Sequence, residues 1–450
     1  MKGVLISSLP DTLQDAITVT RKLHLQYLWI DSLCIIQDSN TDVFEELRRM
    51  HWIYGNAYTT IVACASKNVN EGFLPARSSN LKDTTMPLQV PLGSGGGRIT
   101  IQRYVHPIAD FKIGQGGLRP VNEPINLRGW TFQEQYLSRR ILFFRKSTVF
   151  WECHELRGGP RAREHHLGPQ LSSRVFRKPT AASWTDIVQE YSGRRLSDPH
   201  DKLPALSGIT ADFAARTRHH FAAGLCVDDF PYQLCWKLST AGSRPAAWRA
   251  PSWSWASTDD PVYFLRRTEL DFHPEYLSRD LSCSVLNCQV TPVSMVAPFG
   301  RVVSGFLEIR GRVLRCGPIP GSHRAGDSLY RIKEFAPAAG ERYGGELEFD
   351  ALSKSFFDPD YTAGPHDVRT SRGTEPWGDP VYCLLLCTQQ RTIFNSVEQQ
   401  QQHREGVWWP FGLALRRDEN GDFHRVGLFN GNGLALKTFS EVEAEAIRII

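Results

Sequence analysis

The chain of 450 residues lacks the features that mark membrane and secreted proteins. No apolar run approaches the roughly 18 residues that a membrane-spanning helix needs. The N-terminus has no basic stretch followed by an apolar one, so no secretory signal peptide is predicted. The ten cysteines include no CxxC pair. These absences together predict a cytoplasmic protein without a membrane span.

The chain also lacks a strong charge of either sign. Its net charge is +4, with 41% hydrophobic and 22% charged residues. This composition is typical of a globular protein and argues against a nucleic-acid partner. The length predicts two or three domains, each with its own core.

Common catalytic and metal motifs are missing. No Gly-x-Ser-x-Gly elbow is present, which argues against a hydrolase triad. Cys153-His154 and His165-His166 lack the spacing of zinc ligands. The glycine-rich stretch 93–97 is not followed by Lys-Ser or Lys-Thr, so it is not a phosphate-binding loop. The sequence therefore predicts neither a metal nor a bound cofactor.

The N-terminal third alternates between helical and strand patterns. Helical patterns occur at 11–23, 42–57 and 128–137, and strand patterns occur at 27–31, 59–65, 140–144 and 148–152. This alternation predicts a parallel sheet with covering helices.

The rest of the chain changes character twice. Residues 156–180 are rich in Arg, Gly, Pro and His and are predicted to be a linker or surface loop. Residues 181–260 begin as a helix and end in the tryptophan-containing run Ala250–Ser257, which is expected to pack against another domain. Residues 261–450 are predicted to be rich in β-strands, with a hairpin turn at Asn420-Gly421. We therefore divide the chain into 1–155, 156–180, 181–260 and 261–450.

The segment from Tyr27 to Asp38 is the most informative part of the sequence. It is predicted to be a buried strand that ends on Asp31. In open α/β sheets the carboxyl ends of the strands border the ligand-binding crevice, so Asp31 either contacts a ligand or caps the next turn. Trp29 either stacks on a ring of the ligand or belongs to the core.

The helix predicted at 42–57 places Glu46 at the edge of an apolar stripe, beside Met50 and Ile53. A carboxylate there either looks into a crevice or forms an ordinary boundary pair with Arg49 or a lysine. Arg128, Gln133 and Glu134 form a third group. Arg128 either binds a phosphate or carboxylate, or forms an ion pair that fixes the helix to the sheet.

Three ordered blocks of sequence carry a family resemblance. The first joins Leu9-Pro10-Asp11-Thr12 to Asp15-Ala16-Ile17. The second runs from Tyr27 to Asp38 and continues through Met50, Ile53-Tyr54, Ala57 and Gly72-Phe73-Leu74. The third contains Arg128 to Glu134, Leu137-Ser138, Arg140 and Trp151-Glu152-Cys153. Over about residues 5–153 the chain resembles the fungal heterokaryon-incompatibility (HET) domain, and the runs 201–208 and 250–257 resemble the region that often follows it.

The resemblance implies a flavodoxin-like fold similar to Toll/interleukin-1-receptor (TIR) domains. It implies a signalling and assembly module in non-self recognition and programmed cell death, which acts through a protein partner or through self-assembly. The C-terminal half is then a sensor or regulator.

An alternative function follows from the same likeness. TIR-like domains cleave NAD at the nicotinamide–ribose bond with a glutamate on a helix, which makes Glu46 the candidate catalytic residue and NAD a substrate, not a cofactor. The candidate substrate-binding residues are Asp31, Trp29, Arg128, Gln133 and Glu134.

One block of the family pattern is absent. Family members usually begin with an aromatic-Ser-Tyr-x-Trp-Gly strand before the Leu-Pro helix, and residues 1–9 contain no such block. We therefore expect a truncated or degenerate domain. Its sheet lacks a central strand, and its ligand-binding crevice is incomplete.

Overall fold

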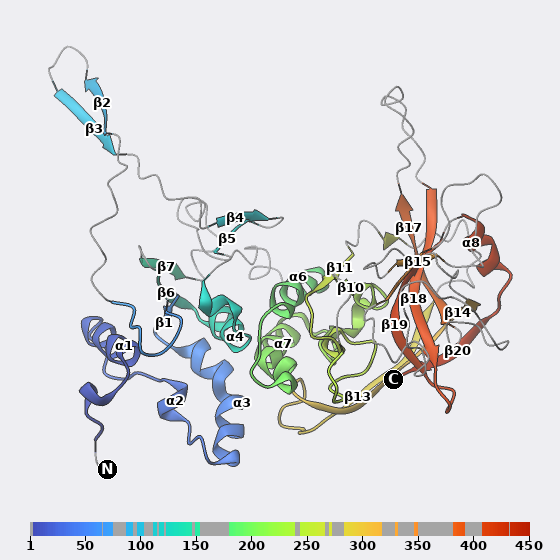
Figure 1. The fold of residues 1–450 in the computed structure, drawn as a ribbon, viewed down its shortest axis with the longest axis horizontal. Helices are drawn as coiled ribbons and strands as arrows, with labels where there is room; N and C mark the ends of the chain where they lie inside the picture. Colours follow the sequence, from blue (N-terminus) through green and yellow to red (C-terminus); the bar gives the residue numbers. More distant parts are fainter. Residues whose placement is uncertain are drawn as a thin grey trace, which may run out of the picture. The chain divides into compact units, whose positions relative to one another are not determined.

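A computed structural model provides the structure of the protein (Figure 1). It describes residues 3–64, 66–74, 87–92, 97–102, 111–114, 117–120, 123–145, 149–153, 180–238, 244–265, 270–271, 283–316, 329–331, 346–349, 381–391, 407–431 and 433–450. The chain divides into two compact units, Met1–Lys178 and Pro179–Ile450. We call them the N-terminal and the C-terminal unit.

The N-terminal unit contains the helices and most of the strands that the sequence predicts. Its helices are α1 (Asp11–Lys22), α2 (Asp31–Cys34), α3 (Asn40–Asn56) and α4 (Trp130–Leu137). Its sheet strands are β1 (Thr60–Ala63), β6 (Arg140–Phe144) and β7 (Val149–Cys153). Two hairpins are formed by β2 (Pro87–Leu92) with β3 (Gly97–Gln102) and by β4 (Phe111–Gly114) with β5 (Gly117–Pro120).

The central sheet of this unit has the order β1-β6-β7. β1 and β6 are parallel, and β6 and β7 are antiparallel. Helices α3 and α4 each lead into one of the parallel strands through a short link. Val62, Cys64, Ile141 and Phe143 form a buried cluster on these strands. The unit therefore combines helices and strands as predicted, but β7 is antiparallel, so the described sheet is mixed and not purely parallel.

The strand predicted at 27–31 is wrong. Residues 25–30 are extended but belong to no strand, and Asp31 instead begins the short helix α2. A strand forms only where a neighbouring chain pairs with its backbone groups, and no described strand pairs with 25–30. Tyr27 is 90% exposed, so the apolar run is not buried either.

Two of the family blocks meet in space at α1. The Asp15 carboxylate accepts hydrogen bonds from the backbone N–H groups of Phe73 and Leu74, at 2.6 and 2.8 Å. Gly72 has φ +62°, and a Cβ there would lie 2.8 Å from Asp15 Oδ2. Only glycine fits this close left-handed turn without strain. Asp15 and Gly72-Phe73-Leu74 thus form one structural joint between the helix and the loop after β1.

The first part of the C-terminal unit is helical around a tryptophan-rich core. Helix α6 (Ala181–Ser192) begins with a capping box of Thr180 and Ser183, and α7 (Pro204–Thr217) follows. The helix predicted at the start of 181–260 is confirmed, and Trp184, Ile187, Val188 and Tyr191 on its apolar face are all at most 1% exposed.

The aromatic run Ala250–Ser257 packs inside this same unit. Trp253 and Trp255 are fully buried. The indole of Trp255 donates to the Gly224 carbonyl at 2.8 Å, and the indole of Trp236 donates to the Trp253 carbonyl at 3.0 Å. Ser252 also donates its backbone N–H to the carbonyl of Ile450 at 3.1 Å. The run therefore ties the helical part to the end of the chain.

The C-terminal sheet has nine strands and confirms the predicted β-rich region. They are β12 (Leu270–Asp271), β13 (Ser284–Pro292), β14 (Val302–Cys316), β15 (Leu329–Arg331), β16 (Glu346–Phe349), β17 (Val381–Arg391), β18 (Val407–Arg417), β19 (Phe423–Asn430) and β20 (Ala444–Ile449). Five of these strands pair in a closed ring, in the order β14-β17-β18-β19-β20 and back to β14.

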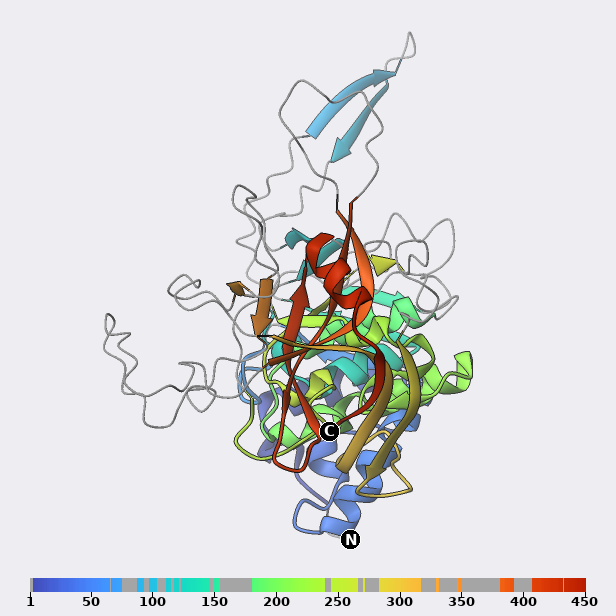
Figure 2. The ribbon, with the colours of Figure 1, turned by 90° about the vertical axis from the view of Figure 1, so that its right-hand side faces the viewer.

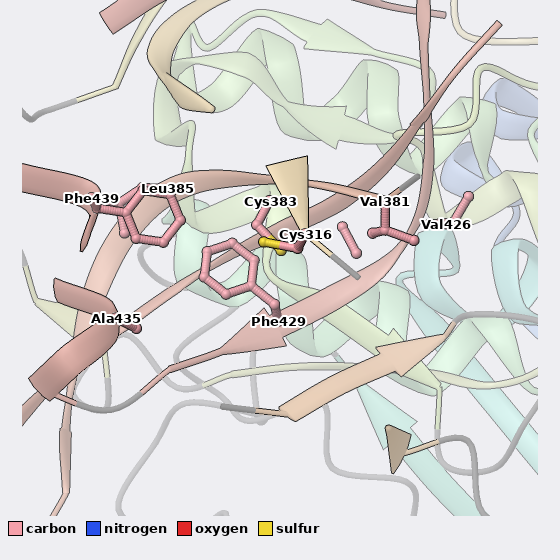
Figure 3. Close-up of a cluster of buried hydrophobic side chains, with 9 residues drawn as sticks. Cys316, Val381, Cys383, Leu385, Val426, Phe429, Ala435 and Phe439 are labelled. Carbon is pink, nitrogen blue, oxygen red and sulfur yellow. The ribbon is translucent and has the colours of Figure 1, made fainter. Parts of the chain in front are cut away.

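The ring closes around a compact apolar core. Helix α8 (Gly433–Ser440) adds Ala435 and Phe439 to the side chains that the strands contribute, and the rings of Phe429 and Phe439 stack at 5.5 Å (Figure 3). Cys383 and Cys387 are buried thiols on β17. The predicted turn at Asn420-Gly421 joins β18 to β19, with Gly421 at φ +90°.

Some predictions fall outside the described residues. These are residues 93–96 of the glycine-rich stretch and the predicted linker except for residue 180. In the part of the chain that the structure describes, no helix is both long and apolar enough to cross a bilayer.

Candidate functional site

The side chain of Tyr54, near the end of α3, is the centre of the candidate site. Its ring meets the Trp29 ring edge-on, with 5.7 Å between centroids. Burial raises the pKa of Tyr54 well above its ordinary value, and the negative charges of Glu134 and Asp31 raise it further. Tyr54 and Glu134 are hydrogen-bonded through their side chains, while the positive charge of Arg128 acts in the opposite direction. We call Trp29, Asp31, Tyr54, Arg128 and Glu134 the Tyr54 cluster.

Local hydrogen bonds fix the segment that carries Trp29 and Asp31. The Asp31 carboxylate accepts the backbone N–H of Ser32 at 2.7 Å within the first turn of α2, whose N-cap residue is Ile30. The Gln37 side chain donates to the carbonyls of Asp31 and Ile35, at 3.3 and 3.1 Å. Asp31 remains exposed, so its other oxygen is open to solvent.

Helix α4 positions Arg128 and Glu134 with hydroxyl groups at its two ends. At the start, the Thr131 hydroxyl lies within 2.9 Å of the Arg128 carbonyl. At the end, Ser138 donates to the Glu134 carbonyl at 2.6 Å, and the hydroxyls of Ser138 and Thr60 lie 2.6 Å apart. The helix is thereby attached to the first residue of β1.

The structure brings together four of the five predicted substrate-binding residues. The fifth, Gln133, is 1% exposed and lies on the buried side of α4. Arg128 is exposed at the start of the helix, and Glu134 is half-buried. An aromatic pair next to two carboxylates and one arginine suits a ligand with a cationic ring, hydroxyl groups and a phosphate.

Glu46 lies on the same helix as Tyr54 and forms an ion pair of its own. Its carboxylate pairs with Arg49 one turn later, 3.1 Å from the guanidinium, and its side chain is 18% exposed. This is the boundary pair that was the alternative interpretation of the sequence.

A second polar cluster follows the two parallel strands. Cys64 comes directly after β1 and Arg145 directly after β6, and Arg145 forms an ion pair with Glu123 at 3.1 Å. Burial raises the pKa of the Cys64 thiol, and the charge and hydrogen bond of Glu123 raise it further. The thiol therefore stays protonated at neutral pH. A protonated thiol is suited to a structural role and not to nucleophilic attack.

The sequence contained signals for both findings. Tyr54 lies on the apolar stripe of α3, and a buried tyrosine hydroxyl needs a polar partner. Arg145 directly follows the strand pattern 140–144, which is the criterion that selected Asp31, whereas Cys64 lies inside the strand pattern 59–65. Among the described residues, no group of three or more His, Cys, Asp or Glu side chains is placed to hold a metal ion.

One family model matches the part of the chain that contains the joint and the cluster just described. Residues 2–134 match the model of the family described as heterokaryon incompatibility protein (HET). The chain carries a HET domain. The matched range includes Asp15, Gly72 and the whole Tyr54 cluster. No curated protein and no solved structure matches the chain.

Proposed function

We propose that this protein is a heterokaryon-incompatibility-type protein that acts as a signalling and assembly module in non-self recognition and programmed cell death. Its HET domain contacts a protein partner or a further copy of itself, and the C-terminal unit is the sensor or regulator. The family match supports the class of protein. The proposal adds how a protein of this class acts, through contact with a partner or with a further copy of itself.

The exposed apolar side chains around α2 carry this proposal. Tyr27, Leu33 and Ile36 are 90%, 51% and 59% exposed within one short stretch of the HET domain. Apolar side chains gathered on a surface are typical of sites that bind other proteins. Nothing in the described fold buries them, so they are available for a partner.

Expression in a fungal host tests the proposal. We expect the full-length protein to reduce viability and the triple substitution Tyr27→Ser, Leu33→Ser, Ile36→Ser to relieve this effect. Tyr263→Ser is the matched control, because Tyr263 is 49% exposed on β11 (Val262–Phe264) of the other unit. Equal killing by the triple variant, at equal protein level and thermal stability, would refute the role of this surface.

A TIR-like fold for the N-terminal unit is part of the proposal. It is supported by the parallel pair β1 and β6, each preceded by a helix that packs beside the sheet. Helices α3 and α4 also pack on each other, with Gly55 close to the carbonyl of Leu137. This is the local pattern of a flavodoxin-like sheet.

A second candidate function is cleavage of NAD at the nicotinamide–ribose bond. The Tyr54 cluster favours it, because its rings suit the cationic nicotinamide and Arg128 suits a phosphate. Nicotinamide departs with the electron pair of the C–N bond, and positive charge develops on the ribose. A nearby carboxylate stabilises that charge, and water then adds to the ribose and gives up a proton. The candidate carboxylates are Glu46, from the helical pattern, and Glu134, from the cluster.

Release of nicotinamide by the purified full-length protein tests this second function. If the chain cleaves NAD, either Glu46→Gln or Glu134→Gln abolishes release and thereby names the catalytic carboxylate. Glu45→Gln is the control, since Glu45 is exposed on the same helix. If the unsubstituted protein releases no nicotinamide, even when it is clustered on a surface, the enzymatic function is refuted.

A further inference from the structure

The hairpin of β13 and β14 has an open edge in the C-terminal unit. In the described part of the chain β13 pairs with β14 alone, so its other side has no strand partner. Figure 2 shows the two strands as adjacent gold arrows that end in a turn. An open strand edge presents unpaired N–H and C=O groups, and it is a template for another strand.

The chemistry of this edge is unusual. Natural proteins protect open edges with charged side chains, but residues 283–300 contain no charged residue at all. Instead, the hairpin exposes large apolar side chains. They are Leu286 at 54%, Val293 at 58%, Met295 at 81%, Val296 at 57% and Val303 at 56%.

The hairpin turn is held rigidly. Val293 donates its N–H to the Arg301 carbonyl at 2.8 Å, and Ala297 and Gly300 close two further turns. The Arg301 guanidinium contacts both Asp198 and Asp201 at 2.6 Å, which fixes the base of the turn to the helical part of the unit. The edge is therefore presented in a fixed conformation, which lowers the entropy lost on pairing.

The backbone alternation identifies which groups are open. Because the Val293 N–H points toward β14, the residues at even positions, Cys288 and Val290, point their N–H and C=O groups to the open side. Pro292 has no N–H on that side, as expected for an edge strand.

The charge pattern indicates which partner fits. A nucleic acid, an anionic membrane or a charged peptide would be recognised through charged side chains, but this edge has none and Arg301 is already neutralised by two aspartates. An uncharged antiparallel edge is complementary to itself through a two-fold axis. Such pairing places no like charges opposite each other and leaves neither β13 edge open.

We propose that β13 pairs antiparallel with β13 of a second copy of this chain, centred on Gln289. In this register Cys288 and Val290 of each copy exchange four backbone hydrogen bonds with the other. Leu286 of one copy then lies beside Pro292 of the second copy, which covers part of the exposed apolar surface. The contact is independent of the surface around α2.

Sedimentation of the full-length chain at a series of concentrations tests this pairing. We expect a dimer that Gln289→Lys weakens by roughly tenfold or more, since two lysines would face each other across the axis. The matched control is Ser304→Lys, which adds the same charge on an exposed position of the neighbouring strand, outside the edge. Hydrogen exchange of residues 284–292 should slow as the dimer forms.

Several results would overturn the proposal. They are a monomer at every concentration, a dimer that Gln289→Lys leaves intact, or equal dissociation by both lysine variants. The triple variant at Tyr27, Leu33 and Ile36 separates this dimer from assembly through the HET domain. The β13 dimer is expected to survive it, and dissociation of the dimer by that variant would also count against the pairing.

Discussion

The joint between α1 and the loop after β1 allows a quantitative prediction. Asp15 accepts two backbone hydrogen bonds, from Phe73 at 2.6 Å and from Leu74 at 2.8 Å, across 58 residues of sequence. A hydrogen bond to a charged group contributes about 1.5–3 kcal/mol. Because the two bonds share one carboxylate oxygen, we expect Asp15→Ala to destabilise this joint by about 2–4 kcal/mol.

Hydrogen exchange is the suitable assay, because it resolves this loop from the rest of a two-unit chain. The exchange of Phe73 and Leu74 should become roughly 30- to 1,000-fold faster in Asp15→Ala, since 1.4 kcal/mol corresponds to a factor of ten. Asp15→Asn keeps one acceptor oxygen and should give a smaller change.

The control for this series is Asp11→Ala. Asp11 lies in the first turn of the same helix but is exposed. Its loss removes only a favourable charge at the helix start, worth about 0.3–1 kcal/mol. Unchanged exchange at Phe73 and Leu74 in Asp15→Ala, or an equal effect of Asp11→Ala, would show that the carboxylate does not hold the loop.

Three further experiments test the packing within each of the two units. Burial lowers the pKa of Lys202 to about 8. The unfolded chain therefore binds this proton at higher pH than the folded chain does. The free energy of unfolding should rise by up to about 3 kcal/mol between pH 8 and 10.5. Urea titrations of Lys202→Met should lack this rise. Arg425 is 1% exposed, and its guanidinium lies 3.4 Å from the centroid of the Trp236 ring. Arg425→Leu should therefore lower the free energy of unfolding by about 2–5 kcal/mol. The control, Arg310→Leu at an exposed position, should lower it by about 0.5 kcal/mol. Thr60→Val and Ser138→Ala should show a coupling of about 0.5–1.5 kcal/mol in a double-mutant cycle.

The elements that the sequence predicts well are those with a strong local signal. Helix α6 shows an apolar face at helical spacing, and its start is marked by Thr180 and Ser183, so both its existence and its orientation could be predicted. The turn at Asn420-Gly421 is similar, because Gly421 adopts a φ that other residues avoid.

The features that the sequence does not predict depend on distant partners. Residues 25–30 have the composition of a strand, but a strand requires a paired neighbour, and no described strand provides one. The contact of Tyr54 with Glu134 joins two helices that are far apart in sequence, so no local pattern contains it. For Glu46 the local pattern is sufficient, because helical spacing places it at the edge of the apolar stripe. The ion pair with Arg49, one turn later on the same helix, then fixes the position of its carboxylate.

The central proposal is that the HET domain acts by contact with a protein partner or a further copy of itself, and NAD cleavage is the alternative. The most direct test is the viability of fungal cells that express the full-length protein with both Glu46→Gln and Glu134→Gln. Both side chains keep their size, so the fold and the exposed surface around α2 should be retained. The account predicts that killing is unchanged in this double variant. Loss of killing, at normal protein level and stability, would contradict the account and favour the enzymatic function.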